Sequence, residues 1–129
     1  MPISKSERIW ISTGEQLIEG NYLRMEVEYA GEIIPVVVFR YKGVCKAFRN
    51  LCVHMPRQLD CELGTIFDST GKYLRCSMHG IVYDPLSGIS VGTICNGEKL
   101  TSICIVEDQQ GVWIQDIRVK SSNSRDTST

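Results

Sequence analysis

The spacing of apolar and polar positions is most regular in the first half of the chain. Short runs rich in Val, Ile, Tyr and Phe are separated there by glycine turns. They predict an antiparallel meander with strands at residues 22–29, 33–41 and 44–48. Because Val36-Val37-Val38 places apolar side chains on both sides of the middle strand, that strand is expected to be buried on both faces.

The end of the chain has a similar pattern. Residues 100–107 and 112–117 are rich in β-branched residues and flank Asp108-Gln109-Gln110-Gly111, which predicts a further hairpin. Residues 121–129 contain no apolar side chain, and a disordered tail is expected there. No convincing amphipathic helix is expected; the best candidate, residues 14–20, would form one or two turns at most.

The central stretch, residues 49–99, is rich in Gly, Asp, Ser, Asn and Pro. Short strands are expected there only at 73–75 and 81–83. Long irregular stretches inside a compact domain usually carry function. The sequence therefore predicts a single all-β domain over residues 1–120, with an antiparallel sandwich as scaffold and function in the loops.

Composition narrows the possible partners. The chain has 14 basic and 15 acidic residues and a formal net charge of −1, so no basic face for nucleic acid is expected. No stretch approaches the roughly 20 apolar residues that span a bilayer, and the first residues lack the apolar centre of a secretory signal. We expect a cytoplasmic protein that binds neither nucleic acid nor membrane.

The six cysteines and two histidines hold the candidate chemistry. Cys52-Val53-His54 and Cys76-Ser77-Met78-His79 each follow a predicted strand. A single Cys beside a single His is commonly a buried thiol next to a hydrogen-bonded imidazole. Here the pairing occurs twice and uses both histidines, which predicts a metal site with two thiolate and two imidazole ligands.

The spacing bears on the metal. Zinc is one alternative, but its Cys pairs and His pairs are usually each separated by several residues, whereas here each pair is mixed. A binuclear iron centre suits mixed pairs, because each loop can give its cysteine to one iron and its histidine to the other. A structural zinc domain remains the alternative at this point.

The two motifs resemble the Rieske-type [2Fe-2S] family, whose signature is Cys-x-His, a spacer, and then Cys-x-x-His-Gly. Gly80 supplies the final glycine, and residues 83–88 resemble the aromatic-Asp turn that follows the second motif. The resemblance covers residues 9–117. It implies a Rieske-like β sandwich in which two loops, within residues 49–99, form a small cluster-binding subdomain.

The resemblance also implies roles for the ligands. Cys52 and Cys76 would bind the inner iron of one [2Fe-2S] cluster, and His54 and His79 would bind the outer iron. Tyr83 stands where the family places a tyrosine that hydrogen-bonds a cysteine sulfur, although an aromatic on a small β strand can equally be a core residue.

High-potential members of the family carry further devices near the cluster. Their disulfide positions correspond to Arg57 and Met78, and their serine position to Ile81, so both devices are missing from this sequence. Only Tyr83 remains. We therefore expect a reduction potential in the lower part of the Rieske range of about −150 to +300 mV.

A ferredoxin is the function this pattern favours: a monomeric one-electron carrier between a flavin-dependent reductase and an oxygenase or another oxidoreductase. No catalytic residue is expected, because an oxygenase iron needs two further histidines and a carboxylate, and both histidines are already assigned. The alternative is a Rieske-like small subunit of a larger reductase of the nitrite-reductase type.

The other four cysteines receive no role. Cys45 and Cys104 lie in predicted strands, where small buried thiols are expected. Cys61 and Cys95 lie in loops, and a disulfide between them is not expected in a reducing compartment.

Overall fold

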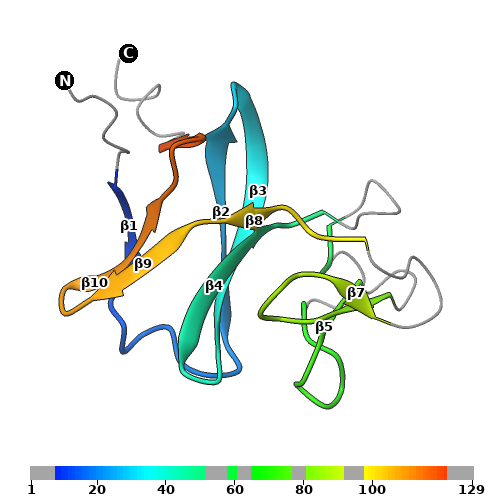
Figure 1. Ribbon diagram of the computed structural model, residues 1–129. Helices are drawn as coiled ribbons and strands as arrows, with labels where there is room; N and C mark the ends of the chain where they lie inside the picture. Colours follow the sequence, from blue (N-terminus) through cyan, green and yellow to red (C-terminus); the bar gives the residue numbers. More distant parts are fainter. Residues whose placement is uncertain (1–7, 52–57, 61–64, 77–80, 92–97, 122–129) are drawn as a thin grey trace. The chain divides into compact units, whose positions relative to one another are not determined.

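The computed structural model describes residues 8–51, 58–60, 65–76, 81–91 and 98–121 (Figure 1). These residues form strands joined by turns, and the strands are β1 (Arg8–Ser12), β2 (Tyr22–Tyr29), β3 (Glu32–Tyr41), β4 (Val44–Arg49), β5 (Leu74–Arg75), β6 (Val82–Tyr83), β7 (Ser90–Val91), β8 (Ser102–Ile103), β9 (Ile105–Asp108), β10 (Gly111–Gln115) and β11 (Val119–Ser121). The ladders β1–β10, β10–β9, β11–β2, β2–β3, β5–β6 and β6–β7 are all antiparallel, which confirms the all-β prediction. No helix among the described residues is long and apolar enough to cross a membrane.

The chain divides into two compact units, and each is described by itself. Met1–Ala47 together with Ile103–Thr129 forms the first, called here the sheet unit. Phe48–Ser102 forms the second, the loop unit. The chain passes from one unit to the other within β4 and again within β8.

The sheet unit is built from long neighbouring strands. One sheet has the order β1-β10-β9 and the other the order β11-β2-β3-β4-β8. The β2–β3 and β3–β4 turns place Ala30-Gly31 and Lys42-Gly43 at positive φ, between 51° and 88°. Positive φ at both central residues is typical of the tight type I′ turn, whose twist suits a hairpin.

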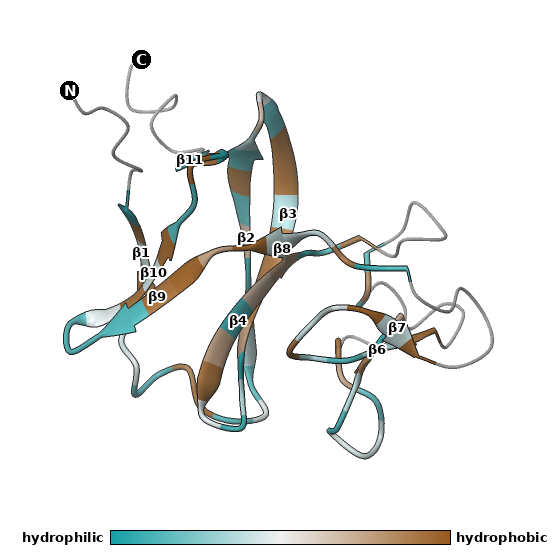
Figure 2. Cartoon of the chain, in the orientation of Figure 1, coloured by the Kyte–Doolittle hydropathy of each residue, from teal (hydrophilic) through white to brown (hydrophobic). Residues whose placement is uncertain are grey.

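One apolar core holds the two sheets of this unit together. Val36, Val37 and Val38 are all fully buried, as the sequence predicts for the middle strand. Figure 2 shows apolar residues at the start of β4 and along the first half of β9, which ends in two acidic residues. The core comprises Leu17, Val27, Ile34, Val36, Val38, Cys45, Ala47, Ile103, Val112, Ile114 and Val119.

Gly111 shapes the pairing of β10 with β1. The register between these strands shifts between Trp10 and Ser12. Gly111 has a φ of 148°, and a Cβ atom there would lie 2.5 Å from the carbonyl oxygen of Ser12 and 2.7 Å from Trp10 Nε1. A side chain would force the backbones apart, so glycine is required at this irregularity.

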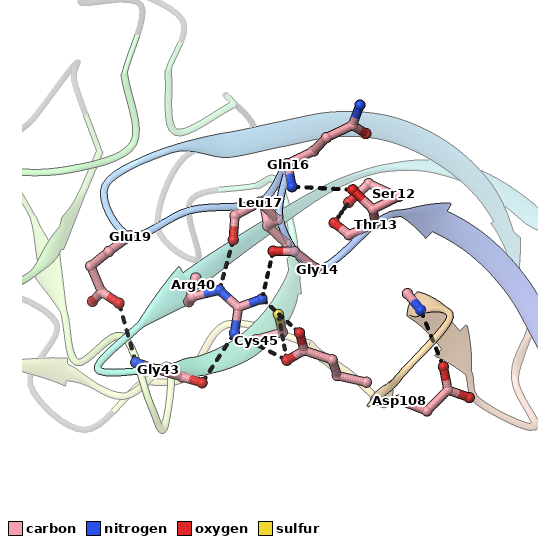
Figure 3. A network of polar contacts seen from close by, with 12 residues as sticks. Ser12, Thr13, Gly14, Gln16, Leu17, Glu19, Arg40, Gly43, Cys45 and Asp108 are labelled. Carbon is pink, nitrogen blue, oxygen red and sulfur yellow. Dashed lines mark hydrogen bonds and ion pairs between the residues drawn. The ribbon is translucent and has the colours of Figure 1, made fainter.

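Residues 14–20, the best helix candidate in the sequence, form a turn, and Arg40 holds its backbone. Its guanidinium donates to the carbonyl oxygens of Gly14 at 3.1 Å and Leu17 at 2.7 Å (Figure 3). Glu107 holds that guanidinium with both carboxylate oxygens, at 3.0 and 2.7 Å. The segment is therefore a turn whose carbonyls bind a side chain from β3.

Other strand predictions need correction. The predicted strand 100–107 is divided into β8 and β9 at Cys104, whose N–H donates to Asp116 Oδ2 at 2.8 Å. Cys104 is exposed, against the prediction, whereas Cys45 is buried as predicted. Strands β1, β7 and β11 are additional to those predicted. Ser121 ends β11, and the rest of the predicted tail lies outside the described residues.

Candidate metal centre

The second predicted motif is positioned by a hairpin of the loop unit. Strands β5, β6 and β7 form a small sheet in which Leu74 pairs with Tyr83, and Arg75 with Val82. The hairpin continues for one step, because the N–H of Cys76 donates to the carbonyl oxygen of Ile81 at 2.8 Å. Cys76 thus stands at the mouth of the hairpin loop, and its side chain is fully buried.

The backbone before Cys76 is fixed on its other side as well. The N–H of Arg75 donates to the carbonyl oxygen of Ile66 at 2.7 Å, and Phe67 forms an isolated antiparallel bridge with Leu74. The backbone N–H of Asp68 donates to the carbonyl oxygen of Tyr73 at 2.9 Å, which closes the turn leading into β5. The backbone that leads to Cys76 is therefore hydrogen-bonded on both sides, which would hold a ligand at this position firmly in place.

The first predicted motif follows β4. Arg49 ends this strand, and the N–H of Leu51 donates to the carbonyl oxygen of Arg49 at 2.9 Å in a tight bend. Cys52 and His54 come next and lie outside the described residues, as does His79 of the second motif. Of the four predicted ligands the structure describes Cys76 alone, so their convergence remains a prediction.

Tyr83 and Ile81 both face the interior of the loop unit. Tyr83 on β6 is fully buried and pairs with Leu74 and Ser90, while Ile81 is buried just before the same strand. The tyrosine position of the family is therefore occupied by an enclosed aromatic. Burial suits both a core side chain and a donor to a buried sulfur.

The turn after the second motif is closely packed. The N–H of Asp84 donates to the carbonyl oxygen of Ile89 at 2.9 Å, and the Asp84 side chain accepts the N–H of Leu86 at 3.0 Å. Gly88 has a φ of 77°, and a Cβ atom there would lie 2.7 Å from Cε1 of Phe48. This aromatic-Asp turn thus depends on glycine for its backbone conformation and for its packing.

Two features beside the first motif were not predicted from the sequence. Nε of Arg49 is buried and has no hydrogen-bond partner among the described residues. An unpaired buried donor costs about 1–3 kcal/mol, so an acceptor from outside the described residues would be stabilising there. Asn50 and Asp60 are buried polar side chains of the same region. The sequence signal for this site is an asparagine two residues before a predicted ligand cysteine.

Comparison with known families decides what kind of site this is. Residues 8–109 match the family model described as the Rieske [2Fe-2S] domain. The chain belongs to the Rieske [2Fe-2S] domain family. Both Cys/His motifs lie inside the matched residues. A Rieske domain implies a [2Fe-2S] cluster as the cofactor, and the resemblance inferred from the two motifs is confirmed.

Solved structures of a ferredoxin and of oxygenase–ferredoxin complexes share the fold. The ferredoxin of carbazole 1,9a-dioxygenase from Nocardioides aromaticivorans IC177 matches with a TM-score of 0.68 and 22% identity, over 86% of this chain and 99% of that chain. The reduced complex between oxygenase and ferredoxin in carbazole 1,9a-dioxygenase matches with a TM-score of 0.65 and 18% identity, over 86% of this chain and 28% of that chain. No curated protein matches. At these identities the likeness is one of fold.

The residues present fit the implied cluster. Cys76 is a buried thiol that forms no disulfide with the other described cysteines, Cys45 and Cys104. Thiolate sulfur is the ligand that iron–sulfur clusters require, and two histidines complete the Rieske set. Among the described residues, no group of three or more His, Cys, Asp or Glu side chains forms another metal site.

Proposed function

We propose that this Rieske protein is a ferredoxin, a one-electron carrier whose cluster is bound by Cys52, His54, Cys76 and His79. The observation that carries the proposal is the family match over residues 8–109, which contains both complete ligand motifs. The likeness to a ferredoxin over 99% of that ferredoxin's length supports it further. The proposal assigns no catalytic residue to this chain.

The ligand set explains why such a carrier works at a moderate potential. When bound, the [2Fe-2S] cluster supplies a reversible one-electron reduction. Two neutral imidazoles in place of two thiolates make the site less negative, which raises its potential above that of an all-cysteine site. The buried side chain of Cys76 would keep its sulfur away from water.

Tyr83 is proposed as the one retained device that raises the potential. A hydroxyl that donates to a ligand sulfur stabilises the extra negative charge of the reduced state. We expect Tyr83→Phe to lower the reduction potential while the described fold is kept, because the phenyl ring fills the same buried space. Potentiometric titration of both proteins measures this, and equal potentials would show that Tyr83 is a core residue only.

Redox proteins are the proposed partners. Known structures include a complex between the oxygenase and the ferredoxin of carbazole 1,9a-dioxygenase, and on that likeness we propose an oxygenase or another oxidoreductase as acceptor. A flavin-dependent reductase is proposed as donor. We also propose a monomer in the cytoplasm, where reducing conditions keep thiols such as those of Cys45, Cys76 and Cys104 reduced.

The test compares two cysteine variants of the purified protein. Cys76→Ser should abolish the visible absorption and the Rieske-type electron paramagnetic resonance (EPR) signal after dithionite reduction, since serine does not replace a thiolate on iron. Cys104→Ser is the matched control, because this exposed cysteine lies outside both motifs, and it should keep both signals. A colourless wild-type protein with stoichiometric zinc would overturn the proposal.

The same preparation separates the carrier from the alternative. A purified monomer that is reduced by a flavin-dependent reductase and reoxidised by an acceptor enzyme supports the ferredoxin. Obligate co-purification with a large subunit would instead indicate the small subunit of a reductase.

A further inference from the structure

A buried polar pair joins the two ends of the segment that carries the first ligand motif. Asn50 Oδ1 accepts the backbone N–H of Leu59 at 2.7 Å. Asn50 Nδ2 donates to Asp60 Oδ1 at 3.2 Å. Asn50 is 1% exposed, Leu59 is fully buried and Asp60 is 5% exposed. One amide side chain thereby connects the chain before the motif to the chain after it.

The pairing gives Asn50 two complementary tasks. Its oxygen satisfies a buried backbone donor, and its nitrogen solvates a buried carboxylate; both groups lose water on burial. Only an amide offers an acceptor and a donor on neighbouring atoms in this way, since a carboxylate lacks the donor and an apolar side chain lacks both. The backbone around Asn50 has little freedom to move, because the N–H of Leu51 donates to the carbonyl oxygen of Arg49.

The sequence position of this pair ties it to the cofactor. Asn50 stands two residues before Cys52, and Leu59 stands five residues after His54. The bond between Asn50 and Leu59 therefore fixes both ends of the segment in which the proposed ligands lie. Partners that orient metal ligands influence both retention of the metal and its redox properties.

We propose that Asn50, acting with Asp60, is a positioning residue for the Rieske cluster: it holds the base of the first ligand segment and so sets how firmly the cluster is retained and at what potential it is reduced. This inference rests on the proposed function. It concerns the described residues Asn50, Leu59 and Asp60, which are not ligands.

The experiment uses three variants of the cluster-loaded protein. Asn50→Leu removes both hydrogen bonds and should release the cluster to a chelator at least several-fold faster than wild type. Asn50→Asp keeps the acceptor for Leu59 but replaces the donor that faces Asp60 with a second carboxyl group, so it should also lose the cluster faster than wild type. Combining Asn50→Asp with Asp60→Asn restores a donor facing an acceptor without changing the net charge, and should return retention and potential toward wild type.

A matched control distinguishes positioning from general stability. Asp116 is a buried polar residue of the sheet unit, 3% exposed, that also accepts a backbone N–H, from Cys104 at 2.8 Å. Asp116→Asn should lower resistance to denaturant while the EPR signal and the potential stay as in wild type. The Asn50 variants should change the EPR line shape and the potential in the folded state, before any unfolding.

The outcomes separate the inference from the function on which it rests. Wild-type protein without iron would contradict the proposed function and the inference together. Wild-type protein with a Rieske signal that Asn50→Leu and Asn50→Asp leave unchanged, in line shape, potential and chelation rate, would overturn the inference alone. Loss of the cluster in the double exchange as fast as in Asn50→Asp would show that Asn50 and Asp60 do not act as a pair.

Discussion

The sheet unit and the loop unit are stabilised in different ways. The sheet unit has strands of up to ten residues and an apolar core shared by its two sheets. In the loop unit the small sheet consists of two-residue strands, and its chain is held by side chains that bond to backbone, such as Asn50, Asp84 and Ser90. The loop unit also buries apolar side chains, such as those of Phe48, Leu74 and Tyr83, but without long ladders its backbone path depends more on individual hydrogen bonds and close packing.

This difference indicates which unit determines the geometry of the proposed redox site. In long ladders many neighbouring pairs fix the path of the backbone, so a single substitution changes the stability of the unit more than its shape. A loop held by a few side-chain contacts has a defined shape only while each contact is made. The unit that carries the proposed ligands is thus the one whose geometry depends on single residues such as Asn50 and Gly88.

The largest effect is expected in the core of the sheet unit. Ile114 on β10 is fully buried in the core between the two sheets. Ile114→Ala removes apolar contacts and leaves a cavity, so the free energy of unfolding should fall by about 2–5 kcal/mol. Denaturant titration measures the loss. Ile117, which is 74% exposed, provides the control, and Ile117→Ala should change stability little. Equal losses in the two variants would contradict the central role of this core.

The same contrast explains what could be predicted from the sequence. Strand 22–29 was predicted with the boundaries it has, and the buried valine run and the glycine turns were predicted correctly, because alternation and turn residues are local signals. The predicted burial of Cys104 was wrong, and the helix candidate at 14–20 forms a turn, because Asp116 and Arg40 bind those segments from other parts of the chain. No local pattern reports such bonds.

The candidate site likewise has features that could be predicted from local sequence and features that could not. The two Cys/His motifs were enough to identify the Rieske family, because the family is recognised by the types and spacing of its ligand residues. It was not enough to find Asn50, whose importance depends on Leu59 and Asp60 lying against it. All four ligands, Cys52, His54, Cys76 and His79, remain predictions, and of these only Cys76 lies within the described residues.

A smaller loss of stability is expected from substituting a glycine of the loop unit. This substitution tests whether close packing stabilises the unit. Gly88 has a φ of 77°, and a Cβ added there would lie 2.7 Å from the Phe48 ring. A left-handed backbone alone costs a non-glycine residue roughly 1–2 kcal/mol. Because the clash with Phe48 adds to this cost, Gly88→Ala should lower the free energy of unfolding by more than that amount. Gly71 is the matched control in the same unit: its φ is 75° and no atom lies within 4 Å of an added Cβ. The excess loss of Gly88→Ala over Gly71→Ala, by denaturant titration, measures the Phe48 contact. Identical losses would show that Phe48 moves aside freely.

The smallest loss of stability is expected from removing a single charge in the sheet unit, where the apolar core provides most of the stability. Hydrogen bonds from the Arg118 guanidinium, which lies 2.6 Å from Asp116, and from the N–H of Cys104 hold the pKa of the Asp116 carboxyl far below its usual value. A folded-state pKa below the unfolded value of about 3.9 means that this stabilisation is fully present above that pH and is lost as the pH falls further.

Asp116→Asn removes this charge and keeps a side-chain oxygen for Cys104. The substitution should therefore cost about 1–2 kcal/mol at pH 7, the scale of a hydrogen bond to a charged group. Because the wild-type carboxylate loses its advantage in acid, the difference between the two proteins should shrink when urea titrations are repeated toward pH 2. A difference that stays constant from pH 7 to pH 2 would mean that Asp116 stabilises the sheet unit through its shape and its bond to Cys104, and that its charge adds nothing measurable.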